Sequence, residues 1–468
     1  MSIPNYPRGF VLGRGPESRP EGFVAGPLFD NFFVDPNLRV TYAINDECNC
    51  RTVVIGSCAY LKDESADPAV LLLEGLAAGG GDFYELLDSL VGRFAVFYEV
   101  DGCIRVVGDA TAMRPIFYAK RGGLVASHAS LLSEVGATCD EKDELPFSSS
   151  TPADTTPYKG VRILLPNFYL AFETGGVTRF WPREPLKEMS TEKAAHSVLE
   201  LATASAKALS AGRQSWLALT GGLDSRVSLA VMINAGLEPQ TFTYGKNAGT
   251  RMDRKVASHL ASRFGFKHFE IPTGQPEEEL KQALDKAHYW NHHHAAVGPL
   301  RGSIADPEAV VYSSNILEIG QSNYRKLQWR AGIDEPTTAG KMAAVYYRKL
   351  SRKAKMEIAD FGKDDYIKEV TDRFQCLIDE TGGPSKHLDP FDDYYWTFRM
   401  GTWHGPSSVE KDFYGEPMNP FNARCIIEPL LSVSDLDQYD LSVFMRLITL
   451  VDCSLLDVPI NPSDLSWL

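Results

Sequence analysis

Short segments in which apolar and polar residues alternate dominate the first part of the chain, and this pattern predicts β-strands. The segments run from about Val40 to Trp181, with strands expected at 52–61, 92–100, 103–110, 115–120 and 123–130. Apolar spacing near 70–76 and 84–91 predicts two helices. A polar loop is expected at 134–158, followed by two strands around a Gly-Gly turn within 160–181. This part is predicted to be an antiparallel α+β domain.

The pattern changes after residues 182–185, where apolar strands begin to alternate with amphipathic helices. Such alternation is typical of a parallel, doubly wound α/β sheet. We expect strands at 216–220, 241–245, 267–271 and 309–313, and helices at 191–211, 253–265 and 277–290. Residues 340–455 are mainly helical in pattern. We therefore divide the chain into two domains, residues 1–185 and residues 186–468.

One turn in the second domain combines six residues that suit phosphate binding. After the apolar run 217–219 the chain reads Thr220-Gly221-Gly222-Leu223-Asp224-Ser225. Glycines allow backbone angles and a close approach that a Cβ would block, and amide N–H groups at a helix N-terminus can hold phosphate oxygens. The hydroxyls of the threonine and the serine add donors. Asp224 would repel a phosphate without a cation between them, so it indicates Mg²⁺. A tight turn with an Asp-Ser N-cap is the structural alternative.

The six residues resemble the pyrophosphate loop of the ATP-pyrophosphatase superfamily, Ser-Gly-Gly-x-Asp-Ser. The flanking segments resemble asparagine synthetases: residues 92–119 include the run Arg114-Pro115-Ile116-Phe117-Tyr118, and residues 158–181 are similar to the family's domain connector. The resemblance covers about 92–324. It implies an N-terminal antiparallel sandwich of the Ntn-hydrolase type, like a glutamine-amidotransferase domain, followed by an ATP-pyrophosphatase domain with a helical C-terminal part.

The resemblance also implies a second phosphate-side loop after the strand at 309–313, although most of its glycines are replaced here. Glu318 stands where an acidic metal ligand is expected, and it would share Mg²⁺ with Asp224. A carboxylate that merely starts a helix is the alternative. Tyr324 is a candidate catalytic residue. Together with Glu410 and Glu416 it is also a candidate for the tyrosine–glutamate pair that deprotonates the amine in β-lactam synthetases.

For the adenine ring, the resemblance implies mainly backbone contacts at the ends of the first two strands, from Leu217, Ala218, Leu219, Thr243, Tyr244 and Gly245. Core-strand positions are the alternative for all but the glycine. Arg226 is a structural or phosphate-side candidate. The run Trp-Asn-His-His-His at 290–294 is expected to be a pocket wall. A metal site is the alternative, but adjacent histidines on a helix point in different directions and rarely bind one ion. Trp396, Arg399 and Trp403, one helical turn apart, would line an acceptor pocket or lie in a core helix.

Two features of glutamine-using relatives are missing. Those enzymes carry a nucleophilic cysteine directly after the initiator methionine, where this chain has Ser2. Their Asn-Gly-Glu segment for glutamine is replaced by the strand VVIGSCAYLKD at 53–63. We therefore expect the first domain to be a scaffold without glutaminase activity, as in β-lactam synthetases and lasso-peptide cyclases. Ser2 acting as an N-terminal nucleophile is the alternative.

Composition narrows the choice of partners. The net charge of -14 over 468 residues disfavours a nucleic-acid partner. No run of about 18 apolar residues predicts a membrane span, and eight cysteines in so long a chain suit a reducing cytoplasm. A homo-oligomer, or a partner protein that supplies substrate, is left open.

We therefore predict an ATP- and Mg²⁺-dependent ligase. It would adenylate the carboxylate of a small molecule or peptide, release pyrophosphate, and let an amine displace AMP. An asparagine synthetase that uses ammonia or glutamine is one alternative. A non-catalytic nucleotide-binding or assembly protein with a relic site is the other.

Overall fold

Two antiparallel sheets form the N-terminal half of the computed structural model, which describes residues 3–13, 19–79, 81–136, 145–245, 247, 249–290 and 293–464. One sheet has the order β10 (Val161–Ile163), β8 (Phe117–Ala119), β9 (Leu124–Ala126), β1 (Phe10–Gly13), β3 (Phe32–Val34), β2 (Val24–Ala25). The other has the order β12 (Gly176–Arg179), β11 (Phe168–Ala171), β7 (Cys103–Gly108), β6 (Leu90–Val100), β5 (Cys50–Tyr60), β4 (Val40–Asn45).

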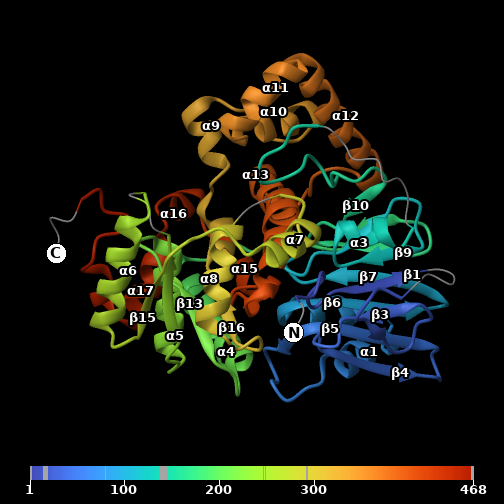
Figure 1. Ribbon diagram of the computed structural model, residues 1–468, viewed down its shortest axis with the longest axis horizontal. Coiled ribbons are helices and arrows are strands. Elements are labelled where there is room, and N and C mark those ends of the chain that lie inside the picture. The colour runs from blue at the N-terminus through green and yellow to red at the C-terminus, as the bar shows by residue number, and fades with distance from the viewer. Residues whose placement is uncertain are drawn as a thin grey trace.

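The two sheets pack face to face as a sandwich (Figure 1). The ring of Phe97 on β6 lies 5.6 Å from that of Phe10 and 5.1 Å from that of Phe32, centroid to centroid, so the aromatic core joins the sheets. Helices α1 (Pro68–Ala77) and α2 (Gly81–Asp88) and the short α3 (Ala129–Glu134) flank it. Asp67 caps α1 by accepting the N–H groups of residues 69 and 70, which fixes where this helix begins.

A five-stranded parallel sheet organises the second half. Its order is β15 (His268–Ile271), β14 (Gln240–Tyr244), β13 (Ser215–Ala218), β16 (Val310–Tyr312), β17 (Glu416–Met418), and every neighbouring pair is parallel. Leu217 packs on the side of α4 (Thr191–Ser210), α5 (Leu223–Asn234), α6 (Arg251–Arg263) and α17 (Ser442–Val451). Trp216 packs on the side of α7 (Glu278–Ala287) and α8 (His294–Ile304). Helices on both faces make the sheet doubly wound.

The C-terminal part is mainly helical, and α10 to α12 form a group above the parallel sheet and the sandwich in Figure 1. Its α-helices are α9 (Arg325–Ala331), α10 (Ala339–Lys349), α11 (Arg352–Phe361), α12 (Lys363–Thr381), α13 (Pro390–Tyr394), α14 (Gly405–Ser408), α15 (Arg424–Leu431) and α16 (Asp435–Tyr439). A π-helix, η2 (Tyr395–His404), and three 3-10 helices, η1 (Asn315–Gln321), η3 (Val409–Phe413) and η4 (Cys453–Leu456), complete it.

The predicted fold class is confirmed: an antiparallel α+β sandwich precedes a doubly wound parallel sheet and a helical C-terminal part. The sequence pattern missed β1, β2 and β3, because each has only two to four residues and no visible alternation. It also gave two strands where 160–181 has three, and it missed β17. The chain leaves the sandwich after β12 and enters the second half at α4, whereas the division at residue 185 stays a prediction.

Candidate functional site

The order of the parallel sheet places two loops side by side at its carboxyl edge. From β13 the chain adds β14 and then β15 on one side of this strand. It then returns to add β16 on the other side, so β13 lies between β14 and β16. Ligands of open α/β sheets bind at such a switch point. The loop after β13 leads into α5, and the loop after β16 leads into η1. Ser228 and Ser314 share a hydrogen bond of 2.7 Å, which ties the two segments together.

The loop after β13 is held by its own polar groups. The N–H of Thr220 donates to Ser225 Oγ (3.1 Å), and the N–H of Gly222 donates to Thr220 Oγ1 (3.2 Å). The N–H of Gly221 donates to Asp253 Oδ1 (2.9 Å) on α6, a residue that the sequence pattern did not single out. Within the described residues no side chain caps the first turn of α5. The donors that face an anion are therefore those at the start of α5, beginning at Leu223.

Neither glycine of this loop is required by backbone conformation, and packing restricts Gly221, where a Cβ would lie 3.2 Å from Asp253 Oδ1, but not Gly222. Gly222 has φ -79°, and Gly221 also avoids the positive-φ region. A Cβ on Gly222 would lie 3.4 Å from Thr220 Oγ1 and 3.6 Å from Asn461 Oδ1, which are ordinary contacts. The expectation that these glycines supply unusual backbone angles is therefore wrong. The remaining reason for a glycine at position 222 is the open space beside it, which a ligand could approach closely because no side chain fills it.

Asp224 and Glu318 come from the two neighbouring loops and line one cavity of about 320 Å³. Burial and, to a lesser extent, the negative charge of Glu318 raise the pKa of the Asp224 carboxyl to about 7, and a hydrogen bond from Gln321 opposes both effects. A buried carboxylate beside a second carboxylate suits a divalent cation. The residues present therefore fit Mg²⁺ at this position.

Aromatic and cationic side chains complete the walls of this cavity. Tyr395 donates a hydrogen bond to Glu318 Oε2, and its ring lies 5.0 Å from that of Tyr324. The ammonium of Lys349 lies 4.6 Å from the centre of the Tyr324 ring. Arg399, on the π-helix η2, donates to Ser149 Oγ (3.1 Å), so the sandwich half also contributes to the wall. The cavity thus combines two carboxylates, two cations and a row of phenols.

A second cavity, of about 430 Å³, lies on the other side of the same loop. It is lined by Thr220, Gly222, Leu223, Asp224, Ser225, Gln321, Asp440, Leu441, Met445, Ile460 and Asn461. Asp224 and Gln321 line both cavities, so this hydrogen-bonded pair stands between them. The N–H of Asn461 donates to the carbonyl of Gly221 (2.9 Å), which lays the C-terminal segment over the loop.

The structure separates the residues expected around adenine. Leu217 and Leu219 are fully buried, and the N–H of Leu219 donates to Phe242 O within the sheet. Gly245 has φ +124° and lies against Thr250. Its backbone conformation therefore explains why this position is a glycine. Tyr244 lines a third cavity, of about 210 Å³. The other residues that line it include Ala218, Phe242, His293, Trp403, Glu410 and Tyr414, but not Thr243. The expected pocket-wall role of the 290–294 run thus holds for His293, whereas residues 291 and 292 lie outside the described residues.

Other candidates lie away from the carboxylate pair. Arg226 is fully buried and donates to the carbonyls of residues 455, 458 and 459, which is a structural role. Glu416 accepts from Ser57 and Arg213, far from the loops. Trp396 is a core residue that donates to Ala110 O (2.7 Å). Of the three residues expected one helical turn apart, only Arg399 reaches the first cavity.

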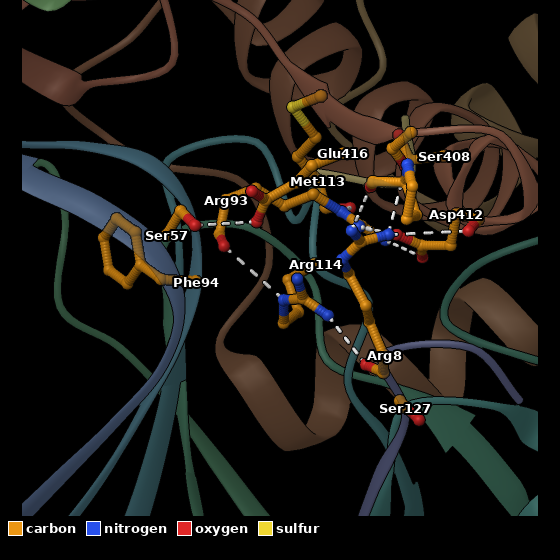
Figure 2. Close-up of polar contacts among 12 residues, drawn as sticks. Arg8, Ser57, Arg93, Phe94, Met113, Arg114, Ser127, Ser408, Asp412 and Glu416 are labelled. Carbon is orange, nitrogen blue, oxygen red and sulfur yellow. Dashed lines mark hydrogen bonds and ion pairs between the residues drawn. The ribbon is translucent and has the colours of Figure 1, made fainter. Parts of the chain in front are cut away.

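Arginines occupy the end of the sandwich where β1 begins (Figure 2). Arg93 donates to both carboxylate oxygens of Asp412 (2.6 and 2.8 Å), and Arg114 donates to the carbonyl of Arg8 (3.0 Å). Arg8 in turn donates to the carbonyl of Gly415 (3.2 Å). This buried network docks the sandwich on η3 and β17. Ser2 lies outside the described residues.

Comparisons with known proteins give only remote similarity. No family model and no curated protein matches the chain. Among solved structures, glutamine phosphoribosylpyrophosphate amidotransferase from B. subtilis, complexed with ADP and GMP, is 12% identical over 69% of this chain and 72% of that chain (TM-score 0.24). Glutamine-dependent NAD⁺ synthetase from Acinetobacter baumannii, in complex with ADP, is 14% identical over 52% of this chain and 56% of that chain (TM-score 0.21).

A third structure, described as the allosteric regulatory enzyme of purine biosynthesis, is 12% identical over 74% of each chain (TM-score 0.22). The first two of these structures contain bound nucleotides, but similarity at such TM-scores does not establish a function for this chain. No helix within the described residues has the length and apolar character needed to cross a membrane.

Proposed function

We propose that this chain is an ATP-dependent carbon–nitrogen ligase of the asparagine-synthetase type, which forms an acyl-adenylate and releases AMP. One observation carries the proposal: Asp224 and Glu318, from loops at the switch point of the parallel sheet, line the same cavity. The cavity beside Gly222 and the start of α5 adjoins them through the Asp224–Gln321 pair. A triphosphate in one cavity would thus meet a carboxylate substrate in the other.

The residues of the two cavities suit the first half of such a reaction. A substrate carboxylate oxygen attacks the α-phosphorus of ATP, the bond from that phosphorus to the bridging oxygen breaks, and pyrophosphate leaves. Asp224 and Glu318 Oε1 would hold Mg²⁺, which supplies positive charge as the pyrophosphate departs. The N–H groups at the start of α5 and the hydroxyl of Thr220 would bind the phosphate oxygens.

The second half uses the wider cavity. The amine nitrogen attacks the acyl carbon, the carbon–oxygen bond to AMP breaks, and the nitrogen loses a proton. Lys349 and Arg399 would orient an anionic group of the substrate, and the tyrosines around them would exclude water. Tyr324 faces this cavity as a candidate catalytic hydroxyl. Because Tyr395 binds only Oε2 of Glu318, the other oxygen of that carboxylate is left for the cation.

The N-terminal half serves in this proposal as a scaffold that completes the acceptor cavity through residues 148–151. The buried contacts of Arg8 and Arg93 with the second half support it, and Arg114 holds Arg8 from within the sandwich. We expect the purified chain to release no glutamate from glutamine. Glutaminase activity that disappears in Ser2→Ala would contradict the scaffold role.

Carboxylate-dependent exchange of labelled pyrophosphate into ATP tests the ligase proposal. A panel of amino acids, peptides and other carboxylic acids is screened with the full chain and Mg²⁺. We expect exchange with at least one class of acid, abolished by Asp224→Asn and by Glu318→Gln. Asp334→Asn, whose side chain is 76% exposed, is the matched control and should keep the parent rate. Exchange at the parent rate in either site variant, or exchange that is absent with every acid, contradicts the proposal.

A further inference from the structure

A buried group of two imidazoles and one carboxylate lies outside the loops described above. His288 follows α7, His294 begins α8 and Glu410 belongs to η3. All three residues are buried, and one potential ligand atom from each lies within 4.8 Å of the others. Within the part of the chain that the structure describes, this is the one group of three or more histidine, cysteine and acidic residues with such spacing.

Both imidazoles are oriented by an oxygen on their Nδ1 side. The Nδ1 of His288 is hydrogen-bonded to the carbonyl of Trp290. The Nδ1 of His294 lies 3.9 Å from Asp285 Oδ1, and its Nε2 lies 3.9 Å from Glu410 Oε2. Histidines that bind a metal usually present one nitrogen to the ion while the other faces a carbonyl or carboxylate, which fixes the tautomer. Both imidazoles here have an oxygen on the Nδ1 side, as in that arrangement.

The carboxylate is also held in place. Glu410 is 1% exposed, and its Oε2 accepts the N–H of His293 (3.0 Å). Burial raises the pKa of Tyr244 and of Tyr414, and the negative charge of Glu410 raises both further. Two imidazole nitrogens and one carboxylate oxygen are ligands that suit Zn²⁺, whereas Mg²⁺ prefers oxygen ligands alone.

We propose that His288, His294 and Glu410 bind a zinc-type divalent ion, which joins the end of α7 and the start of α8 to η3. The same 3-10 helix carries Asp412, the partner of Arg93 in the sandwich. The ion would therefore brace the segment on which the two halves dock. It is separate from the magnesium position between Asp224 and Glu318, so it neither requires nor tests the ligase activity.

The test measures metal content and affinity in the full chain without any substrate. The protein is stripped with a chelator, dialysed against buffer containing Zn²⁺, and analysed by elemental mass spectrometry. We expect one Zn²⁺ per chain and a higher unfolding temperature than for the stripped protein. His294→Gln and Glu410→Gln should each weaken Zn²⁺ binding by at least about tenfold. His196→Gln, whose side chain is 60% exposed, is the control and should bind as the parent does.

X-ray absorption of the zinc-loaded parent keeps the test decisive if a variant fails to fold. We expect only nitrogen and oxygen ligands, with two imidazoles. A sulfur ligand would place the ion on cysteines and overturn the proposal. So would a parent chain that retains no Zn²⁺, or site variants that bind Zn²⁺ as tightly as the His196→Gln control.

Discussion

Asp224 is a residue whose proposed role in binding a cation works against the stability of the folded chain. Its pKa rises from 3.8 to about 7 on folding, chiefly through burial. The folded chain therefore binds this proton more tightly than the unfolded chain does, and the free energy of unfolding falls as pH rises from about 4 to about 7. The penalty is complete above that range.

We accordingly expect Asp224→Asn to stabilise the protein at pH 8 in the absence of Mg²⁺. Removing the charge relieves its burial and its repulsion from Glu318, which is worth on the order of 2–4 kcal/mol before solvent screening reduces it. Urea unfolding at pH 5 and pH 8 measures the effect, which should be larger at the higher pH. A variant less stable than the parent at pH 8 would show that the carboxylate is well solvated or paired.

Gln321 gives a second prediction, because its hydrogen bond lowers the pKa of Asp224. Mg²⁺ competes with the proton for this carboxylate, so the affinity for Mg²⁺-ATP should rise with pH around pH 7 and level off above it. Gln321→Ala should move the midpoint to higher pH. Binding titrations between pH 6 and pH 9 report it, and Gln375→Ala on α12 is the matched control. An unchanged midpoint would mean that another group governs the pH dependence.

At the scale of elements, the loop between β13 and α5 forms the expected strand-to-helix connection without unusual backbone angles at its glycines. Gly222 needs neither a positive φ nor missing space for the protein's own packing. Gly222→Ala should therefore change the free energy of unfolding by less than about 1 kcal/mol. It should weaken Mg²⁺-ATP binding by about tenfold or more, since the new methyl group would stand in the phosphate cavity. Comparable losses of stability and binding would instead indicate a general disruption of the loop.

The sequence predicted this loop and Glu318 because both follow directly from strand-to-helix connections, where local pattern and chain order decide the position. It could not find Tyr395 or Gln321 as members of the site. Tyr395 is brought in by the π-helix η2, whose wider turns break the one-turn spacing expected of Trp396, Arg399 and Trp403. Gln321 closes a 3-10 helix that lies where the resemblance implies a second phosphate-side loop. Both depend on tertiary packing that periodicity does not encode.

At the scale of the whole molecule, buried ion pairs fix the sandwich against the second half (Figure 2). The side chains of Arg93 and Asp412 are 1% and 2% exposed. Asp412→Asn leaves a buried guanidinium without its counter-charge, so we expect a loss of about 3–5 kcal/mol in the free energy of unfolding. Chemical denaturation measures it, with Asp334→Asn as the exposed control. A loss below 1 kcal/mol would mean that the halves do not dock as described.

This docking explains why the cavity shared by the two halves could not be predicted from the sequence. The apolar patterns of each half predict its own sheets, whereas Ser149 reaches Arg399 only because the halves are held together. The acceptor cavity thus belongs to both halves. In the proposed function, the N-terminal half would act as a scaffold for this cavity.

The central claim is that Asp224 and Glu318 form a working Mg²⁺-ATP site at the switch point of the parallel sheet. Isothermal titration calorimetry of the full chain with ATP tests it without knowledge of the carboxylate substrate. We predict one saturable site that requires Mg²⁺, with affinity reduced about tenfold or more in Asp224→Asn and in Glu318→Gln. No binding heat at about 1 mM ATP, or identical isotherms for parent and variants, would contradict it and point to a relic site.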